Sequence, residues 1–113
     1  MWFRDIPTLL ARYNIGAVII NSDIEGLEQH LDAGHTVITS VNSELIWHKP
    51  VEDRDKYGNP THNHSVVVTG VDTRNEVVHL NDSGSDEGRD EQIPLALFIQ
   101  AWAAGNDLMA VTT

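Results

Sequence analysis

Apolar residues recur along this chain with two different spacings, which predict short helices alternating with short strands. Spacings of three and four residues are typical of one face of a helix. Ser22 and Glu25 have the spacing of a capping box. In this motif the Ser22 hydroxyl and the Glu25 carboxylate each accept a hydrogen bond from the backbone N–H of the other residue. The predicted helices are Ile6–Tyr13, Ser22–Gly34 and Pro94–Ala103.

Runs of β-branched and alternating apolar residues predict the strands. The most distinct run is Ser65–Val71, and Thr73–Asn75 after it suits a three-residue hairpin loop, with Asn75 in the left-handed conformation. The predicted strands are Ala17–Ile20, Thr36–Val41, Ser65–Val71, Glu76–Leu80 and Leu108–Val111. The pattern predicts an α+β fold, with a mainly antiparallel sheet of about five strands and two or three helices.

Length and charge narrow the classes of protein that fit. The chain has 113 residues, which suits a single domain spanning 1–113. It has 7 Lys and Arg against 17 Asp and Glu, so its formal charge is 7 − 17 = −10. A surplus of negative charge repels phosphate groups, so we expect neither a nucleic acid nor a membrane surface as partner. Cysteine is absent, which excludes disulfides and a cysteine nucleophile within these residues.

A histidine and an aspartate stand at corresponding ends of the predicted hairpin strands. With a three-residue loop, Asp72 faces Glu76 and Asp82 lies opposite Val66, two residues from His64 on the same face. Diagonal neighbours of this kind have Cβ atoms about 7–8 Å apart, which permits a hydrogen bond between imidazole and carboxylate. Such a carboxylate fixes the imidazole tautomer, as a general base requires. The geometry alone also fits an ordinary surface pair, and a one-residue change of register would separate the two groups.

Four segments in a fixed order carry a resemblance to a known family. They are Leu31–Thr39, His64–Asp72, Glu76–Asp82 and a helix containing Leu97–Trp102. Together they resemble the second half of papain-like cysteine peptidases, most of all the bacteriocin-leader-processing type (cysteine-peptidase family thirty-nine). The resemblance extends over most of the chain, from about Leu9 to Val111.

The resemblance implies a papain-like half-domain in which His64 corresponds to the catalytic base and Asp82 to the residue that orients it. The family's nucleophilic Cys and oxyanion-hole Gln precede all the segments matched here, and this chain has no Cys. The resemblance therefore implies a fragment or a pseudoenzyme that lacks its N-terminal Cys-bearing segment and is inactive alone. It also implies a peptide or protein as substrate or ligand, no cofactor, and completion of the fold by an upstream segment or by self-association.

Two other classes of protein fit the same residues. His62 and His64 are two residues apart, and with Asp82 or His48 they would form a three-ligand site for zinc or a similar metal. A non-catalytic interaction module would instead use exposed apolar residues such as Trp2, Phe3 and Trp47. The first residues do not resemble a secretory signal, so we expect a cytoplasmic protein if Met1 is the native start. Otherwise the chain is part of a longer protein, and that protein could be exported.

Overall fold

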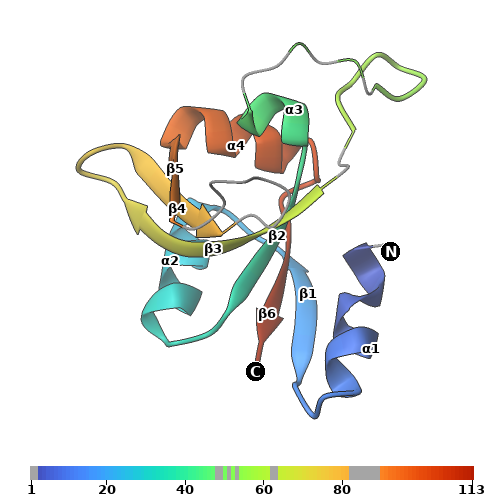
Figure 1. Ribbon diagram of the computed structural model, residues 1–113, viewed down its shortest axis with the longest axis vertical. Helices are drawn as coiled ribbons and strands as arrows, with labels where there is room; N and C mark the ends of the chain where they lie inside the picture. Colours follow the sequence, from blue (N-terminus) through green and yellow to red (C-terminus); the bar gives the residue numbers. More distant parts are fainter. Residues whose placement is uncertain (1–2, 48–49, 51, 53, 62–63, 82–89) are drawn as a thin grey trace.

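A single antiparallel sheet forms the centre of the molecule (Figure 1). The computed structural model describes residues 3–47, 50, 52, 54–61, 64–81 and 90–113. Among these residues the sheet has six strands in the order β1-β6-β2-β3-β4-β5, and every neighbouring pair is antiparallel. The strands are β1 (Ala17–Asn21), β2 (Val37–Val41), β3 (His64–Asp72), β4 (Val77–Asn81), β5 (Glu91–Pro94) and β6 (Leu108–Thr112). The predicted α+β class with a mainly antiparallel sheet is confirmed.

Helices cover the sheet and close its ends. They are the 3₁₀ turn η1 (Phe3–Asp5) and the α-helices α1 (Ile6–Ala11), α2 (Ile24–Asp32), α3 (Ser43–Ile46) and α4 (Leu95–Ala103). Helices α3 and α4 pack against each other at one end of the sheet, and α1 packs beside β1 (Figure 1). The short helix α3 falls in a segment whose sequence pattern was ambiguous, because four residues are too few to show a helical period.

One hydrophobic cluster joins the helices to the sheet. Leu27 of α2, Ile46 of α3, and Phe98 and Trp102 of α4 are all buried in it. The indole Nε1 of Trp102 donates a hydrogen bond to the Leu108 carbonyl at 2.9 Å, which satisfies the polar end of a buried ring. Trp102 is therefore a core residue. The buried strand residues of the cluster are Val37, Val41, Val66, Val68, Val78, Leu80, Ile93, Met109 and Val111.

Helix α2 begins one residue later than the predicted capping box requires. Asp23, in extended backbone conformation, is the N-cap, and its Oδ1 accepts from the Gly26 N–H at 2.8 Å. The Ser22 hydroxyl instead contacts the Asp23 carbonyl at 3.5 Å. The capping box of Ser22 and Glu25 is wrong, because the third helical position is Gly26 and Glu25 lies one position too early to reach back.

The hairpin turn differs from the prediction. Asp72 pairs with Val77, so the turn holds four residues, and Glu76 rather than Asn75 adopts the left-handed conformation, with φ of 57°. Asn75 stays in the turn because its N–H and its Nδ2 donate to the two carboxylate oxygens of Asp72, at 3.1 and 2.7 Å. These two hydrogen bonds stabilise Asn75 in the turn without the left-handed conformation.

A β-bulge in β3 restores the predicted register farther along the hairpin. The register shifts between Val68 and Gly70, so that Thr69 is an extra residue on β3. Beyond the bulge, Val67 pairs with Asn81, which is the pairing that the sequence predicted for this end of the hairpin. The extra residue in the turn and the extra residue in β3 therefore cancel in the strand register at the His64 end of β3.

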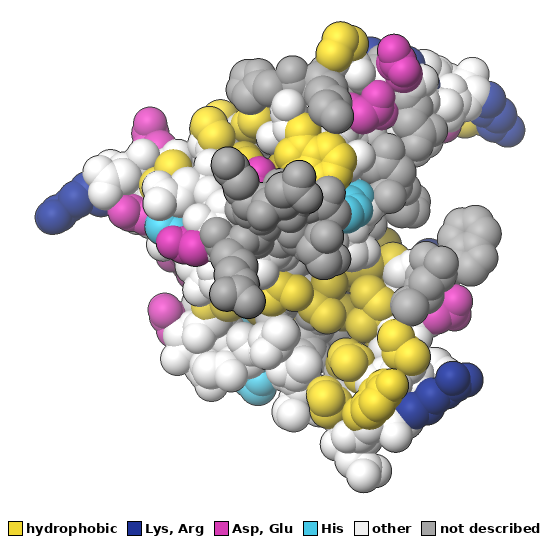
Figure 2. Space-filling view, in the orientation of Figure 1, with side chains coloured by type: hydrophobic (Ala, Val, Ile, Leu, Met, Phe, Trp, Pro, Cys, Tyr) yellow, Lys and Arg dark blue, Asp and Glu magenta, His cyan; other side chains and the backbone are white. Residues whose placement is uncertain are grey.

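Apolar surface stays exposed along one edge of the sheet. Tyr13, Ile15 and Val18 are 71%, 41% and 48% exposed, and hydrophobic side chains gather over β1 in the space-filling view (Figure 2). Within the part of the chain that the structure describes, β1 pairs with β6 alone and forms one edge of the sheet. Among the described residues, no helix has the length and apolar character needed to cross a bilayer.

Candidate functional site

His64 stands at the start of β3, beside the end of β2. It pairs with Val41, the last residue of β2, and its side chain is half-buried. Side chains alternate along a strand, so His64 lies on the same face as Val66 and Val68, which are 2% and 1% exposed. The imidazole thus lies at the rim of the hydrophobic core and is partly exposed.

An indole ring packs against this imidazole. Trp47 follows α3 as its C-cap, and its ring centroid lies 5.4 Å from that of His64, with the planes inclined by 52°. Contacts of this geometry stabilise both rings and restrict their rotation. The sequence offered Trp47 as an exposed apolar residue of an interaction module, whereas the structure packs its ring against His64.

A buried asparagine holds the segments around His64 together. Asn42 follows Val41 directly and is fully buried. Its Oδ1 accepts from the Leu45 N–H at 3.0 Å, which caps α3, and its Nδ2 donates to the Thr61 carbonyl at 2.6 Å. Its backbone N–H donates to the Ala101 carbonyl in α4 at 3.0 Å. Asn42 therefore fixes α3, with Trp47 at its end, and the chain leading into β3. The sequence pattern does not single out Asn42, because one polar residue after a strand resembles any turn.

The predicted partners of His64 lie outside the described residues. These are Asp82, the expected orienting carboxylate, and His62 and His48, the alternative metal ligands. Among the described residues, no group of three or more His, Asp and Glu side chains is arranged to hold a metal ion. The pairing of His64 with Asp82 and the metal site both stay predictions.

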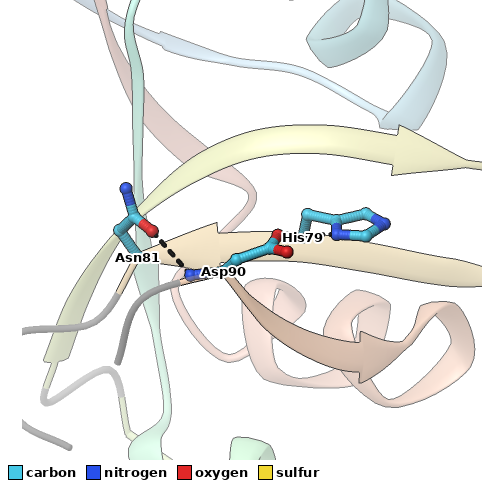
Figure 3. Close-up of polar contacts among 3 residues, drawn as sticks. All are labelled: His79, Asn81 and Asp90. Atoms are coloured by element: carbon cyan, nitrogen blue, oxygen red, sulfur yellow. Dashed lines mark hydrogen bonds and ion pairs between the residues drawn. The ribbon is translucent and has the colours of Figure 1, made fainter. Parts of the chain in front are cut away.

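A second histidine–carboxylate pair lies on β4 and just before β5. His79 Nδ1 and Asp90 Oδ1 are 2.8 Å apart, and the Asp90 N–H donates to Asn81 Oδ1 at 2.9 Å (Figure 3). The side chains of His79 and Asp90 are 30% and 69% exposed. Asp90 has φ of 51°, so the Asn81 amide oxygen helps to hold an unusual backbone conformation.

This second pair is separate from His64. His79 alternates with Val78 and Leu80, which are buried, and Leu80 pairs with Val68 on the face that His64 shares. His79 therefore projects from the opposite face of the sheet. His79 pairs locally there, with Asp90. An exposed pair of this kind contributes little to stability and by itself indicates no chemistry.

Among the acidic groups described, Asp72 has a pKa that is shifted from its usual value. Hydrogen bonds from the Asn75 side chain, and then from its backbone N–H, hold the pKa of Asp72 below its usual value of 3.8. The cause is local turn geometry at the hairpin tip, far along β3 from His64. It indicates a structural carboxylate and not a catalytic one.

Comparison with known proteins assigns the chain to a family. The model of the Peptidase_C39 like family matches residues 4–108. Since this match covers nearly the whole chain, the protein belongs to that family, as the sequence resemblance predicted. A crystal structure described as that of a C39-like peptidase from Bacillus anthracis superimposes with a TM-score of 0.71, at 24% identity, over 96% of this chain and 56% of the other. That likeness shows the papain-like, C39-related fold.

Curated relatives match more closely in sequence. Uncharacterised proteins of Mycobacterium tuberculosis and Mycobacterium bovis are each 56% identical to this chain over 119 aligned positions. The match covers 96% of this chain and 51% of each relative. The chain thus spans about half the length of the curated relatives it matches.

Proposed function

We propose that this chain is the histidine-bearing part of a C39-like cysteine peptidase, with His64 as general base and Asp82 as the residue that orients it. The observation that carries the proposal is the position of His64 at the start of β3, where its ring packs against Trp47 and the residue stays partly exposed. A base in acyl transfer needs a fixed orientation and access to the substrate.

The register near His64 supports the role of Asp82. Val67 pairs with Asn81, the residue before Asp82, in the alignment that the predicted His64–Asp82 contact requires. A carboxylate there would keep one imidazole nitrogen protonated and leave the other free to accept a proton.

The nucleophile in this proposal comes from outside these 113 residues. The chain contains no Cys, and an imidazole without a thiol cannot form the thiolate that attacks a peptide carbonyl. We therefore expect no peptide hydrolysis from this chain alone. With a thiol supplied by a further segment or chain, the expected reaction is cleavage of a peptide bond through an acyl-enzyme. Without one, the chain is a non-catalytic relative.

The tautomer of the His64 imidazole tests the proposal in the chain itself. The ¹⁵N shifts of the two ring nitrogens, measured above the titration range, report which one carries the proton. We expect a single tautomer in the wild type and a mixture in Asp82→Ala. The matched control is Asp86→Ala, which removes another carboxylate from the same acidic segment and should leave the tautomer unchanged. If Asp82→Ala leaves the His64 nitrogens unaltered, the pairing is wrong.

A further inference from the structure

A groove lies between α3, the 54–61 loop and the C-terminal end of α4. Its volume is about 730 Å³, within the range of pockets that hold ligands. Neither His64 nor Trp47 is among the described residues that line it, so it is distinct from the site described above. The described residues lining the groove are Leu45, Asp55, Asn59, Pro60, Thr61, Gln100, Ala103, Ala104 and Asn106.

The three walls of the groove are joined by Asn42. Its side chain binds the Leu45 N–H of the α3 wall and the Thr61 carbonyl of the loop wall. Its backbone N–H binds the Ala101 carbonyl of the α4 wall. One buried residue thus fixes the separation of the walls, so the groove exists before any ligand binds, which reduces the entropy lost on binding.

The loop wall is itself a closed turn. Asp55 Oδ1 accepts from the N–H groups of Tyr57 and Asn59, at 2.8 and 3.0 Å, and the Asp55 N–H donates to the Asn59 carbonyl at 2.9 Å. The guanidinium of Arg54 donates to the Gly58 carbonyl at 2.7 Å. These bonds use one carboxylate oxygen of Asp55 and hold its side chain at the groove in a fixed position.

The chemistry of the lining indicates the class of ligand. Asp55 is the one ionisable residue among the described lining residues, and it is negative. The amides of Asn59, Gln100 and Asn106 offer both donors and acceptors, as a peptide backbone requires, while Leu45, Pro60 and the two alanines provide apolar contacts. The chain's charge of −10 also attracts a basic partner.

From these features we infer that the groove binds an extended peptide segment that carries an arginine or lysine, with Asp55 as the counter-ion. This binding site goes beyond the proposed function, because it requires neither His64 nor a thiol. A peptide is favoured over a free amine because three amide side chains and an apolar floor lie beside the single charge.

The test is a titration of the ¹⁵N-labelled chain with an acetylated, amidated seven-residue Ala/Ser peptide that has one central Arg. The side-chain NH₂ groups of Asn59, Gln100 and Asn106 are direct reporters, and we expect them to shift with saturation. The same peptide with citrulline in place of Arg should bind about fivefold more weakly, as expected for loss of one exposed charge pair. Acetyl-arginine amide alone should bind more weakly still.

Two variants separate groove binding from general attraction. Asp55→Asn keeps the oxygen that closes the turn but removes the charge, and should reduce the affinity for the Arg peptide about fivefold. Asp32→Asn makes the same change in net charge on α2 and should leave the affinity unchanged. Ala103→Arg places a cation in the groove, at a helix end that tolerates it, and should abolish binding.

Three results would overturn the inference. One is the absence of saturable shifts at the three amide groups. Another is equal binding of the Arg and citrulline peptides, or of the Arg peptide and acetyl-arginine amide. The third is an equal loss of affinity in Asp32→Asn and Asp55→Asn. Each outcome is independent of the His64 tautomer, so this inference and the proposed function can fail separately.

Discussion

The rings of Trp47 and His64 lie 5.4 Å apart between centroids and are inclined by 52°. The two residues come from different elements, the end of α3 and the start of β3, and they meet because Val41 and Asn42 join both elements to the end of β2. One face of the imidazole is consequently packed by an aromatic neighbour. This contact can be tested without any assumption about catalysis.

Replacing the indole should change the magnetic environment of His64. In Trp47→Leu we expect the His64 ring protons to move toward their random-coil shifts, because the ring current of the indole is removed. The measurement is a ¹H–¹³C correlation spectrum of the aromatic region. Tyr57→Leu, which removes a ring that is 76% exposed and lies in the loop, should leave those shifts in place. Unchanged His64 shifts in Trp47→Leu would contradict the contact.

Asn42 should contribute more to stability than its single side chain suggests. Asn42→Ala removes the cap of α3 and leaves the partly buried Thr61 carbonyl without this donor, so we expect a loss of about 2–4 kcal/mol in the free energy of unfolding. Asn42→Asp keeps the acceptor for Leu45 but buries a carboxylate against the Thr61 carbonyl oxygen, so it should lose at least as much stability as Asn42→Ala. Urea unfolding measures both. Gln29→Ala on the exposed side of α2 should stay within about 0.5 kcal/mol of the wild type, and a similarly small loss for Asn42→Ala would disprove the role.

Periodicity predicted the parts of the fold that depend on burial. The alternation of Val66 and Val68 places β3 correctly, and the spacing of Phe98 and Trp102 places α4 correctly, because each pattern reflects contact with one core. Strand β5 was missed. It contains a proline and, among the described residues, pairs with β4 alone, so it needs neither a buried face along its whole length nor a full set of N–H donors.

The hairpin shows why register is harder to predict than secondary structure. A three-residue turn without a bulge and a four-residue turn with one at Thr69 give the same pairing of Val67 with Asn81. Hydrophobic pattern cannot distinguish them, because both keep Val66 and Val68 on the buried face. The candidate site shares this limit, since Asn42 and the Trp47–His64 contact depend on tertiary packing, which leaves no period in the sequence.

Gly105 should be intolerant of a side chain for a steric reason. A Cβ at this position would lie 2.0 Å from the Ser40 carbonyl oxygen, which belongs to the backbone of β2 and cannot move aside. We expect Gly105→Ala to lower the free energy of unfolding by about 2–3 kcal/mol. Gly34→Ala is the comparison, since Gly34 has φ of +85° and open space around it and should lose only about 1 kcal/mol from backbone strain. Equal losses in urea unfolding would mean that the close approach of Gly105, in the turn after α4, to β2 is wrong.

The hydrogen bonds between Asn75 and Asp72 should make the stability of the hairpin tip depend on pH. They favour the ionised carboxylate, so the pKa of Asp72 is lowered in the folded state relative to 3.8. The stability gained from them is therefore present at neutral pH, above the unfolded pKa, and is lost as the pH falls through the folded pKa below 3.8. Asn75→Ala removes the strongest of these donors. The difference in urea stability between the wild type and Asn75→Ala should be largest at neutral pH and shrink below 3.8.

Other carboxylates titrate in the same range, and a double-mutant cycle separates them from Asp72. In an Asp72→Asn background the effect of Asn75→Ala should no longer change with pH, because the ionisable partner is gone. If the pH dependence of the Asn75→Ala effect is the same in both backgrounds, it arises from other groups. The two hydrogen bonds would then stabilise the turn without any preference for the charged form of Asp72.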